Sequence, residues 1–159
     1  MRSLPILLPA ALINARACPL ASIRQVRTWR LRFVEQVPDD LARPAGWSDV
    51  VEAGATARDD GAGPSWPTEL AGDGFRALWD APRPVSGPVR LRGELVVDPL
   101  DGLATTGRIH RLRLVTQTVG EDGAGERVVA CSTRDLSAVP KAVDAGDRGV
   151  LVDLELGVT

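Results

Sequence analysis

The strongest constraint on the fold is a run of alternating apolar and polar residues near the middle of the chain. In VRLRGELVVD, residues 89–98, every second residue is apolar or glycine. This period of two is typical of a strand with one buried face and one solvated face. After the turn sequence PLDG, the run RIHRLRLVTQTV, residues 108–119, continues the pattern with two irregular positions. The segment therefore predicts two long strands, the second with one bulge or with an end covered on both sides.

Similar alternation appears on both sides of this block. It is found in TWRLRFVEQV (28–37), FRALWDAP (75–82), RVVACST (127–133) and GVLVDLELGV (149–158). Gly93 falls on an inward position of its strand, where a missing side chain permits a bend or the close approach of another strand. Helix signals are few, so these segments predict an antiparallel β fold.

Five or six such strands predict a mainly β protein. We expect a small antiparallel barrel, either OB-like (the oligonucleotide/oligosaccharide-binding type) or a similar half-open barrel, or else a sandwich. A long irregular insertion and one or two short helices complete the expected fold. With 159 residues, the chain is long enough for one domain and short for two. The predicted core consists of Leu91, Leu95, Val97, Leu112, Leu114, Val152 and Leu154, with His110 on the same face as Leu112.

The expected insertion spans residues 38–74, which are rich in Pro, Gly, Asp and Ala. Within it, only a short helix capped by Asp49 is predicted. Trp47 and Trp66 also lie in this segment. Large rings in such a loop either pin it to the core, the interpretation that we favour, or belong to a binding surface. One further helical turn is expected after Pro140.

Residues 1–25 precede the first predicted strand. They contain a short apolar run behind one arginine and before an A-R-A triplet that ends at Ala17. This is the order of a signal peptide, but prolines inside the run and arginine inside the triplet depart from the pattern. We expect a flexible extension, or a start nearer Val26, with the signal peptide as the alternative. The first interpretation implies a cytoplasmic protein with a single β-rich domain, residues 26–159, and the second implies export.

The chain has few residues suited to metal binding or catalysis. It has one histidine, His110, and two isolated cysteines, Cys18 and Cys131, and it carries no phosphate-binding, dinucleotide-binding or hydrolase motif. We therefore expect no metal, no cofactor and no catalytic group. The net charge of −2 excludes a basic field over the whole protein, so any contact with nucleic acid or anionic lipid would be local. We therefore predict a non-enzymatic binding or interaction module. An enzyme that lacks a recognisable motif is the alternative.

Two arginines alternate on each of the two central strands. If these strands are neighbours, four guanidinium groups share one face, which suits a phosphate or carboxylate clamp. The competing and favoured interpretation is a solvated sheet face with cross-strand ion pairs. The candidate binding residues are Arg90, Arg92, Arg111, Arg113, Trp47 and Trp66. A protein or an acidic small molecule is the expected partner, and an oligonucleotide is the alternative, weakened by the lack of aromatic residues among the arginines.

Overall fold

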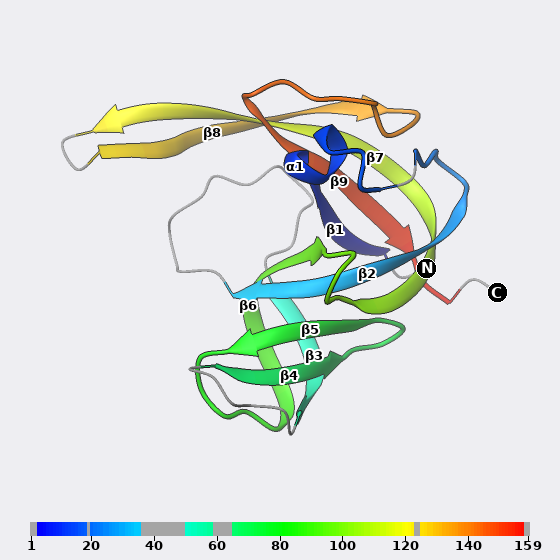
Figure 1. Ribbon diagram of the computed structural model, residues 1–159, viewed down its shortest axis with the longest axis vertical. Coiled ribbons are helices and arrows are strands. Elements are labelled where there is room, and N and C mark those ends of the chain that lie inside the picture. Colours follow the sequence, from blue (N-terminus) through cyan, green and yellow to red (C-terminus); the bar gives the residue numbers. More distant parts are fainter. Residues whose placement is uncertain (1–2, 19, 36–49, 59–64, 123–124, 158–159) are drawn as a thin grey trace.

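The computed structural model describes residues 3–18, 20–35, 50–58, 65–122 and 125–157. Strands make up most of the described chain (Figure 1). They are β1 (Ser3–Pro9), β2 (Val26–Glu35), β3 (Val50–Ala57), β4 (Trp66–Ala71), β5 (Arg76–Ala81), β6 (Gly87–Val97), β7 (Leu103–Asp122), β8 (Gly125–Leu136) and β9 (Asp147–Glu155), with one helix, α1 (Ala10–Asn14). Among the residues that the structure describes, no helix is long and apolar enough to cross a membrane.

The strands form one sheet that closes on itself. Their order is β2-β5-β4-β3-β6-β1-β9-β7-β8, and a further pairing of β2 with β7 closes eight strands into a barrel, leaving β8 as an extra strand beside β7. Two pairings are parallel, β1 with β6 and β2 with β5, and the others are antiparallel. The predicted mainly β barrel is confirmed. It is closed rather than half-open, because β2, at one end of this order, pairs with β7 near the other end.

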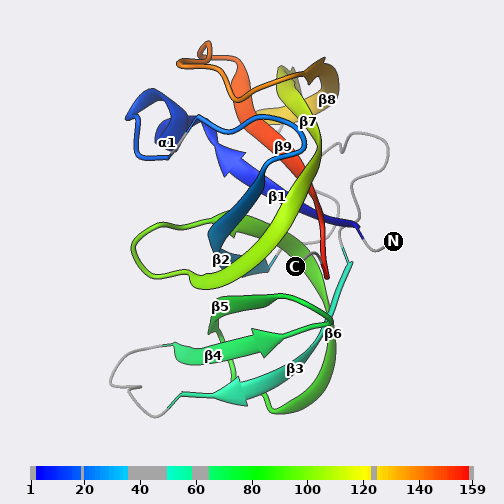
Figure 2. The same ribbon diagram turned by 90° about the vertical axis from the view of Figure 1, so that its right-hand side faces the viewer.

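Strand β2 also pairs with β6, which divides the ring into two circuits of five strands. The lower circuit contains β2, β5, β4, β3 and β6, and the upper circuit contains β2, β6, β1, β9 and β7 (Figure 2). The shared pairing requires the predicted glycine: a Cβ on Gly93 would lie 2.2 Å from the carbonyl oxygen of Val34. Because any side chain there would collide with the backbone of β2, Gly93 permits the close approach of the two strands.

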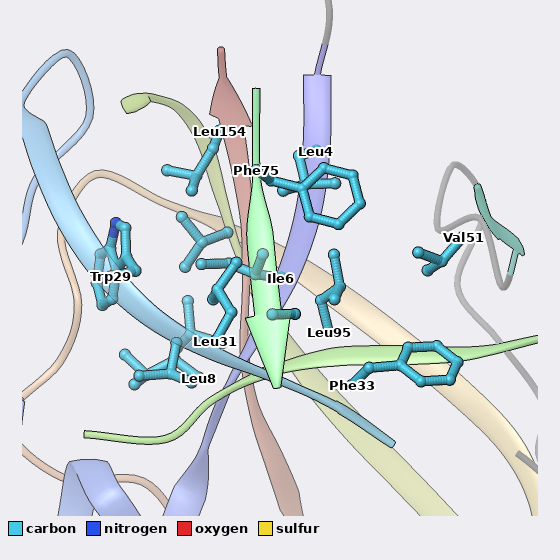
Figure 3. Packing of buried hydrophobic residues seen from close by; sticks show 14 of the residues in the cluster. Leu4, Ile6, Leu8, Trp29, Leu31, Phe33, Val51, Phe75, Leu95 and Leu154 are labelled. Atoms are coloured by element: carbon cyan, nitrogen blue, oxygen red, sulfur yellow. The ribbon is translucent and has the colours of Figure 1, made fainter. Parts of the chain in front are cut away.

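One hydrophobic core extends through both circuits (Figure 3). All seven predicted core residues are buried. On β2, Trp29, Leu31 and Phe33 face inward, as their alternation predicts. Phe33 meets Trp79 of β5 edge to face, with ring centroids 5.8 Å apart, a favoured arrangement for aromatic pairs. The alternating apolar residues of β2 therefore contribute to the core of both circuits, which share this strand.

The expectation of a flexible extension over residues 1–25 is wrong for β1, which lies between β6 and β9 in the sheet. Ile6 and Leu8 are fully buried, and β1 pairs with β9 along its whole length. The physical reason is that β1 is an interior strand. Such a strand has apolar residues on both faces, so it lacks the alternation that revealed the others.

The predicted irregular insertion is wrong in part. Its segment 50–57 forms β3 instead of the expected helix, and β4 follows. Val51 and Ala55 of β3 pack into the core, and β3 pairs with β4 and β6, so these tertiary contacts override the local helix signal. Asp49 and Trp47 lie outside the described residues. The helical turn expected after Pro140 is absent from the connection 137–146, which the structure describes throughout.

Strand β7 contains the predicted bulge. Its register against β9 shifts between Ile109 and Arg111, so that Ile109 is fully buried and His110, predicted to face inward, is exposed. Beyond the bulge both faces are covered, and Arg113 is buried at 3% exposure although its position predicted solvent. The bulge exchanges the faces at Ile109 and His110, whereas Arg113 stays on its predicted face and is buried because that face is also covered.

Candidate functional site

The structure does not bring the four candidate arginines together. Arg90 and Arg92 lie on β6, and Arg111 and Arg113 lie on β7, but β1 and β9 separate these strands in the sheet. The premise that the strands are neighbours is therefore wrong. Although a tight turn joins β6 to β7, each strand pairs with β2 instead of with the other.

The lower circuit holds the first pair of arginines and one tryptophan. Both Arg90 and Arg92 are exposed, and Arg90 Nε lies 3.8 Å from an oxygen of Glu52 on the adjacent β3. Trp66 begins β4 and is 45% exposed, so the interpretation that it pins a loop to the core is wrong. Since β3 lies between β4 and β6, Trp66 is not on a strand adjacent to the arginines.

The second pair of arginines is held by acidic side chains. Arg111 Nε donates to Asp135 Oδ1 of β8 at 2.9 Å, and this hydrogen bond lowers the pKa of Asp135. The guanidinium of Arg113 lies 3.3 Å from Asp153 of β9. Burial raises the pKa of Asp153, and the opposing charge of Arg113 only partly offsets this. Both arginines thus have structural contacts.

Several other arginines of the barrel wall also contact acidic side chains. Arg32 on β2 pairs with Asp80 and Asp98, and the buried Glu94, which its position in the alternation predicted to be solvated, pairs with Arg148. Burial alone would raise the pKa of Asp98, but hydrogen bonds from Arg32 and from two backbone N–H groups of the turn outweigh it and lower the pKa. The wall arginines with an acidic partner are Arg32, Arg76, Arg83, Arg90, Arg111, Arg113 and Arg148.

A pocket of about 270 Å³ lies where α1 and the turn that follows it meet the connection from β8 to β9. Val143 N donates to Asn14 Oδ1 at 2.8 Å and thereby ties α1 to this connection. We call this hollow the corner pocket. It is lined by Ile13, Arg16, Cys18, Leu20, Pro140 and Lys141.

The corner pocket combines apolar walls with two cations. Within the part of the chain that the structure describes, neither Arg16 nor Lys141 forms an ion pair, and no acidic residue lines the pocket. Seven arginines of the wall, in contrast, have an acidic partner, whereas Arg30 of β2 donates to backbone carbonyl oxygens. An uncompensated pair of positive charges beside apolar surface is suited to an anion that carries an apolar part.

The backbone around the pocket is locally strained. Arg16 and Arg24 have φ angles of 55° and 74°, and among the described residues they are the non-glycine residues with positive φ. Each is held by a backbone hydrogen bond, from Arg16 N to Ile13 O at 3.0 Å and from Arg24 N to Ile109 O at 2.7 Å. Strain of about 1 kcal/mol or more per residue persists where the surroundings impose it, and it clusters at functional sites.

Cys18 contributes an apolar wall to the pocket. Its Sγ lies 3.9 Å from the carbonyl oxygen of Leu12, and burial raises the pKa of the thiol. The thiol is therefore protonated at neutral pH, whereas a reactive cysteine requires a thiolate. Cys18 is therefore part of the apolar lining of the pocket and is not an activated nucleophile.

Two sequence signals point to this corner. The first 34 residues contain six arginines and no acidic residue, and Lys141 is the only lysine of the chain. The first signal falls largely in the segment that was expected not to pack. A charge count by segment would have shown a basic end on a chain of net charge −2.

The described residues contain no group of three His, Cys, Asp or Glu side chains that could hold a metal ion. No protein family, no curated protein and no solved structure matches this chain.

Proposed function

We propose that this protein is a non-enzymatic binding module whose corner pocket holds a small, partly apolar carboxylate. The observation that carries the proposal is the pairing of Arg16 and Lys141, neither with an acidic partner in the described chain, with apolar lining residues. Ligand pockets are commonly apolar with a few polar groups that orient the ligand. In the corner pocket these polar groups are cations.

The size and lining of the pocket narrow the ligand class. At about 270 Å³, it lies at the small end of ligand pockets, so it suits a short molecule or one end of a longer molecule. A carboxylate carries one charge to be desolvated beside apolar walls, whereas a phosphate carries more, and desolvating charge is costly. A medium-chain fatty acid meets both conditions.

The alternative of an oligonucleotide-binding barrel has less support. The arginines of β6 and β7 lie apart and several have acidic partners. Binding of single strands normally needs aromatic rings beside the cations, and Trp66 lies on a strand that is not adjacent to either pair.

Titration of the full chain with octanoate, followed by calorimetry, tests the proposal. We expect binding of octanoate and much weaker binding of octanol, which has the same chain length without the charge. Lys141→Met should raise the Kd for octanoate about tenfold, because a charge-assisted contact is lost while the apolar stem is kept. Lys141→Arg should retain most of the affinity.

The matched control is Arg90→Met, which removes an exposed cation from the lower circuit and should leave the Kd unchanged. Equal Kd values for the wild type and Lys141→Met, or equal binding of octanoate and octanol, would contradict the proposal.

A further inference from the structure

We infer that this corner of the barrel docks on an anionic lipid surface. The contact is made by three exposed aliphatic side chains, Leu20, Ile23 and Val26, which we call the docking strip. The inference rests on the proposed function, because Leu20 lines the corner pocket and also belongs to the strip. A ligand with an alkyl chain partitions into lipid, so a binding module at the lipid surface would meet its ligand there.

The docking strip concentrates exposed apolar surface. Leu20, Ile23 and Val26 are 54%, 37% and 46% exposed and lie within seven residues. The other exposed large apolar side chains of the described chain, Val34, Trp66 and Leu100, are dispersed in sequence and lie on β2, β4 and the turn after β6. Isolated apolar residues on a surface are ordinary, but a cluster is typical of an interaction site.

Cations lie within the docking strip and beside it. Arg24 lies inside it and forms no ion pair in the described chain, and the two pocket cations lie at one end. Arg108 of β7 is paired in register with Val26, and Glu155 of β9 lies on the other side of Arg108. Because the first acidic residue of the chain is Glu35, the strip carries no acid of its own.

The strip is held in place by the barrel. Ala21 is fully buried, and Val139 N donates to its carbonyl oxygen at 2.8 Å. Ile23 N donates to Ser137 O at 3.1 Å. These contacts fix the backbone between Leu20 and Val26, so docking requires little further ordering of the chain.

Aliphatic side chains with interspersed cations match a lipid interface better than a nucleic acid. An interfacial segment buries its apolar face about 5–10 Å into the headgroup region, and each cation near an anionic surface contributes about 1 kcal/mol. Single-stranded nucleic acid instead binds to aromatic rings, and the docking strip has none.

Co-sedimentation with vesicles tests the inference. We expect the full chain to sediment with vesicles of phosphatidylcholine and phosphatidylserine at low salt, and not with vesicles of phosphatidylcholine alone. The double variant Leu20→Asn/Ile23→Asn should weaken sedimentation at least tenfold. Arg24→Gly should weaken it about fivefold through the lost charge, since glycine accepts the positive φ at this position.

Two variants serve as matched controls. Leu100→Asn removes an aliphatic side chain that is 83% exposed at the turn after β6, and Arg90→Gln removes an exposed cation from the lower circuit. Both should sediment as the wild type does. Unchanged melting temperatures of all the variants would show that any loss of sedimentation comes from the surface and not from the fold.

Failure of wild-type sedimentation with the anionic vesicles, or equal sedimentation of the wild type and the double variant, would overturn the inference. The inference would also be overturned, in favour of nucleic acid, if the chain bound a labelled single-stranded oligonucleotide more tightly than the anionic vesicles. In that case the affinity should fall in Arg24→Gly and stay unchanged in Leu20→Asn/Ile23→Asn. The octanoate titration is independent of vesicles. If the chain binds octanoate and not vesicles, the docking inference is wrong and the proposed function stands. If it binds vesicles and not octanoate, the proposed function of the corner pocket is wrong and docking stands.

Discussion

The barrel wall and the corner near α1 treat their cations differently. On the wall, Arg32 and Arg113 contact carboxylates of neighbouring strands, and Arg148 of β9 contacts Glu94 of β6 across the intervening β1. At the corner, Arg16 and Lys141 stand beside apolar side chains and form no ion pair in the described part of the chain. Several cations of the wall thus join strands through ion pairs, whereas the two cations of the corner are the ones that we propose to contact a ligand.

This difference shows that the abundance of arginine is a poor guide to a binding surface. A guanidinium that already binds a carboxylate has satisfied much of its charge and hydrogen-bonding capacity, and a ligand must compete with that partner. A cation without an acidic partner presents its full charge. Stability should therefore depend on the wall and affinity on the corner.

The largest effect is expected at the buried pair of Glu94 and Arg148. Glu94→Ala should lower the free energy of unfolding by about 3–5 kcal/mol, because it leaves a mostly buried guanidinium without its carboxylate. Urea denaturation followed by tryptophan fluorescence measures the loss. Glu52→Ala, which breaks the exposed pair with Arg90, should cost no more than about 0.5 kcal/mol. Similar losses in both variants would contradict a special role for the buried pair.

Arg113→Met should have the next largest effect, about 2–3 kcal/mol at neutral pH, since Asp153 then keeps a poorly solvated charge. Burial raises the pKa of Asp153 above its ordinary value of 3.8, so the folded protein binds this proton more tightly than the unfolded chain does. The cost of ionised Asp153 is present above the folded pKa and is relieved as the pH falls toward 3.8.

Denaturation of Arg113→Met and the wild type across this acid range checks the sign. The gap between their free energies of unfolding should narrow as the pH is lowered. If the difference in free energy of unfolding grew on acidification, the pKa of Asp153 would be lower in the variant than in the wild type, contrary to the prediction.

Asp98→Asn should cost less, about 1–1.5 kcal/mol at neutral pH, because the charge-assisted hydrogen bond from Arg32 is weakened while an oxygen remains for the turn. Hydrogen bonding lowers the pKa of Asp98, so its stabilising effect is present above 3.8 and disappears as the pH falls through the lower folded value. Thermal melts of the variant and the wild type should therefore converge in strong acid. A constant difference at every pH would refute this origin of the stabilisation.

The smallest effect on stability is expected at the corner. Lys141→Met should change the free energy of unfolding by less than about 0.5 kcal/mol, because Lys141 forms no ion pair with any residue that the structure describes. Differential scanning calorimetry without ligand measures this change. A loss comparable to that of Arg113→Met would place Lys141 among the structural cations of the wall and remove the distinction between the two regions.

Local alternation predicted the strands with one solvated face. Leu91, Leu95 and Val97 on β6 lie in the core as expected, and Gly93 permits the predicted close approach. The same rule missed β1, which is covered on both faces, and it misplaced His110 because a bulge reversed the alternation. Period-two patterns identify a strand only when its two faces meet different environments.

The candidate site was less predictable than the fold. The arginines were correctly identified as residues of sheet faces, and cross-strand ion pairs, the interpretation favoured from the sequence, are found for Arg90, Arg111 and Arg113. The corner pocket could not be found in this way. Arg16 and Lys141 lie 125 positions apart in sequence, and only the docking of α1 on the connection after β8 makes them neighbours.

The sequence by itself determined that this chain is mainly β and which alternating residues face its core, because side-chain alternation and turn residues act over a few neighbouring positions. It left a barrel and a sandwich as alternatives. Which strands are neighbours was decided only by the tertiary structure, as were the partner of each arginine and the position of the corner pocket. Strand order depends on contacts between segments distant in sequence, and whether a cation is paired depends on that order. Arginine therefore forms ion pairs at several places on the wall, and at the corner Arg16 forms none with the residues that the structure describes.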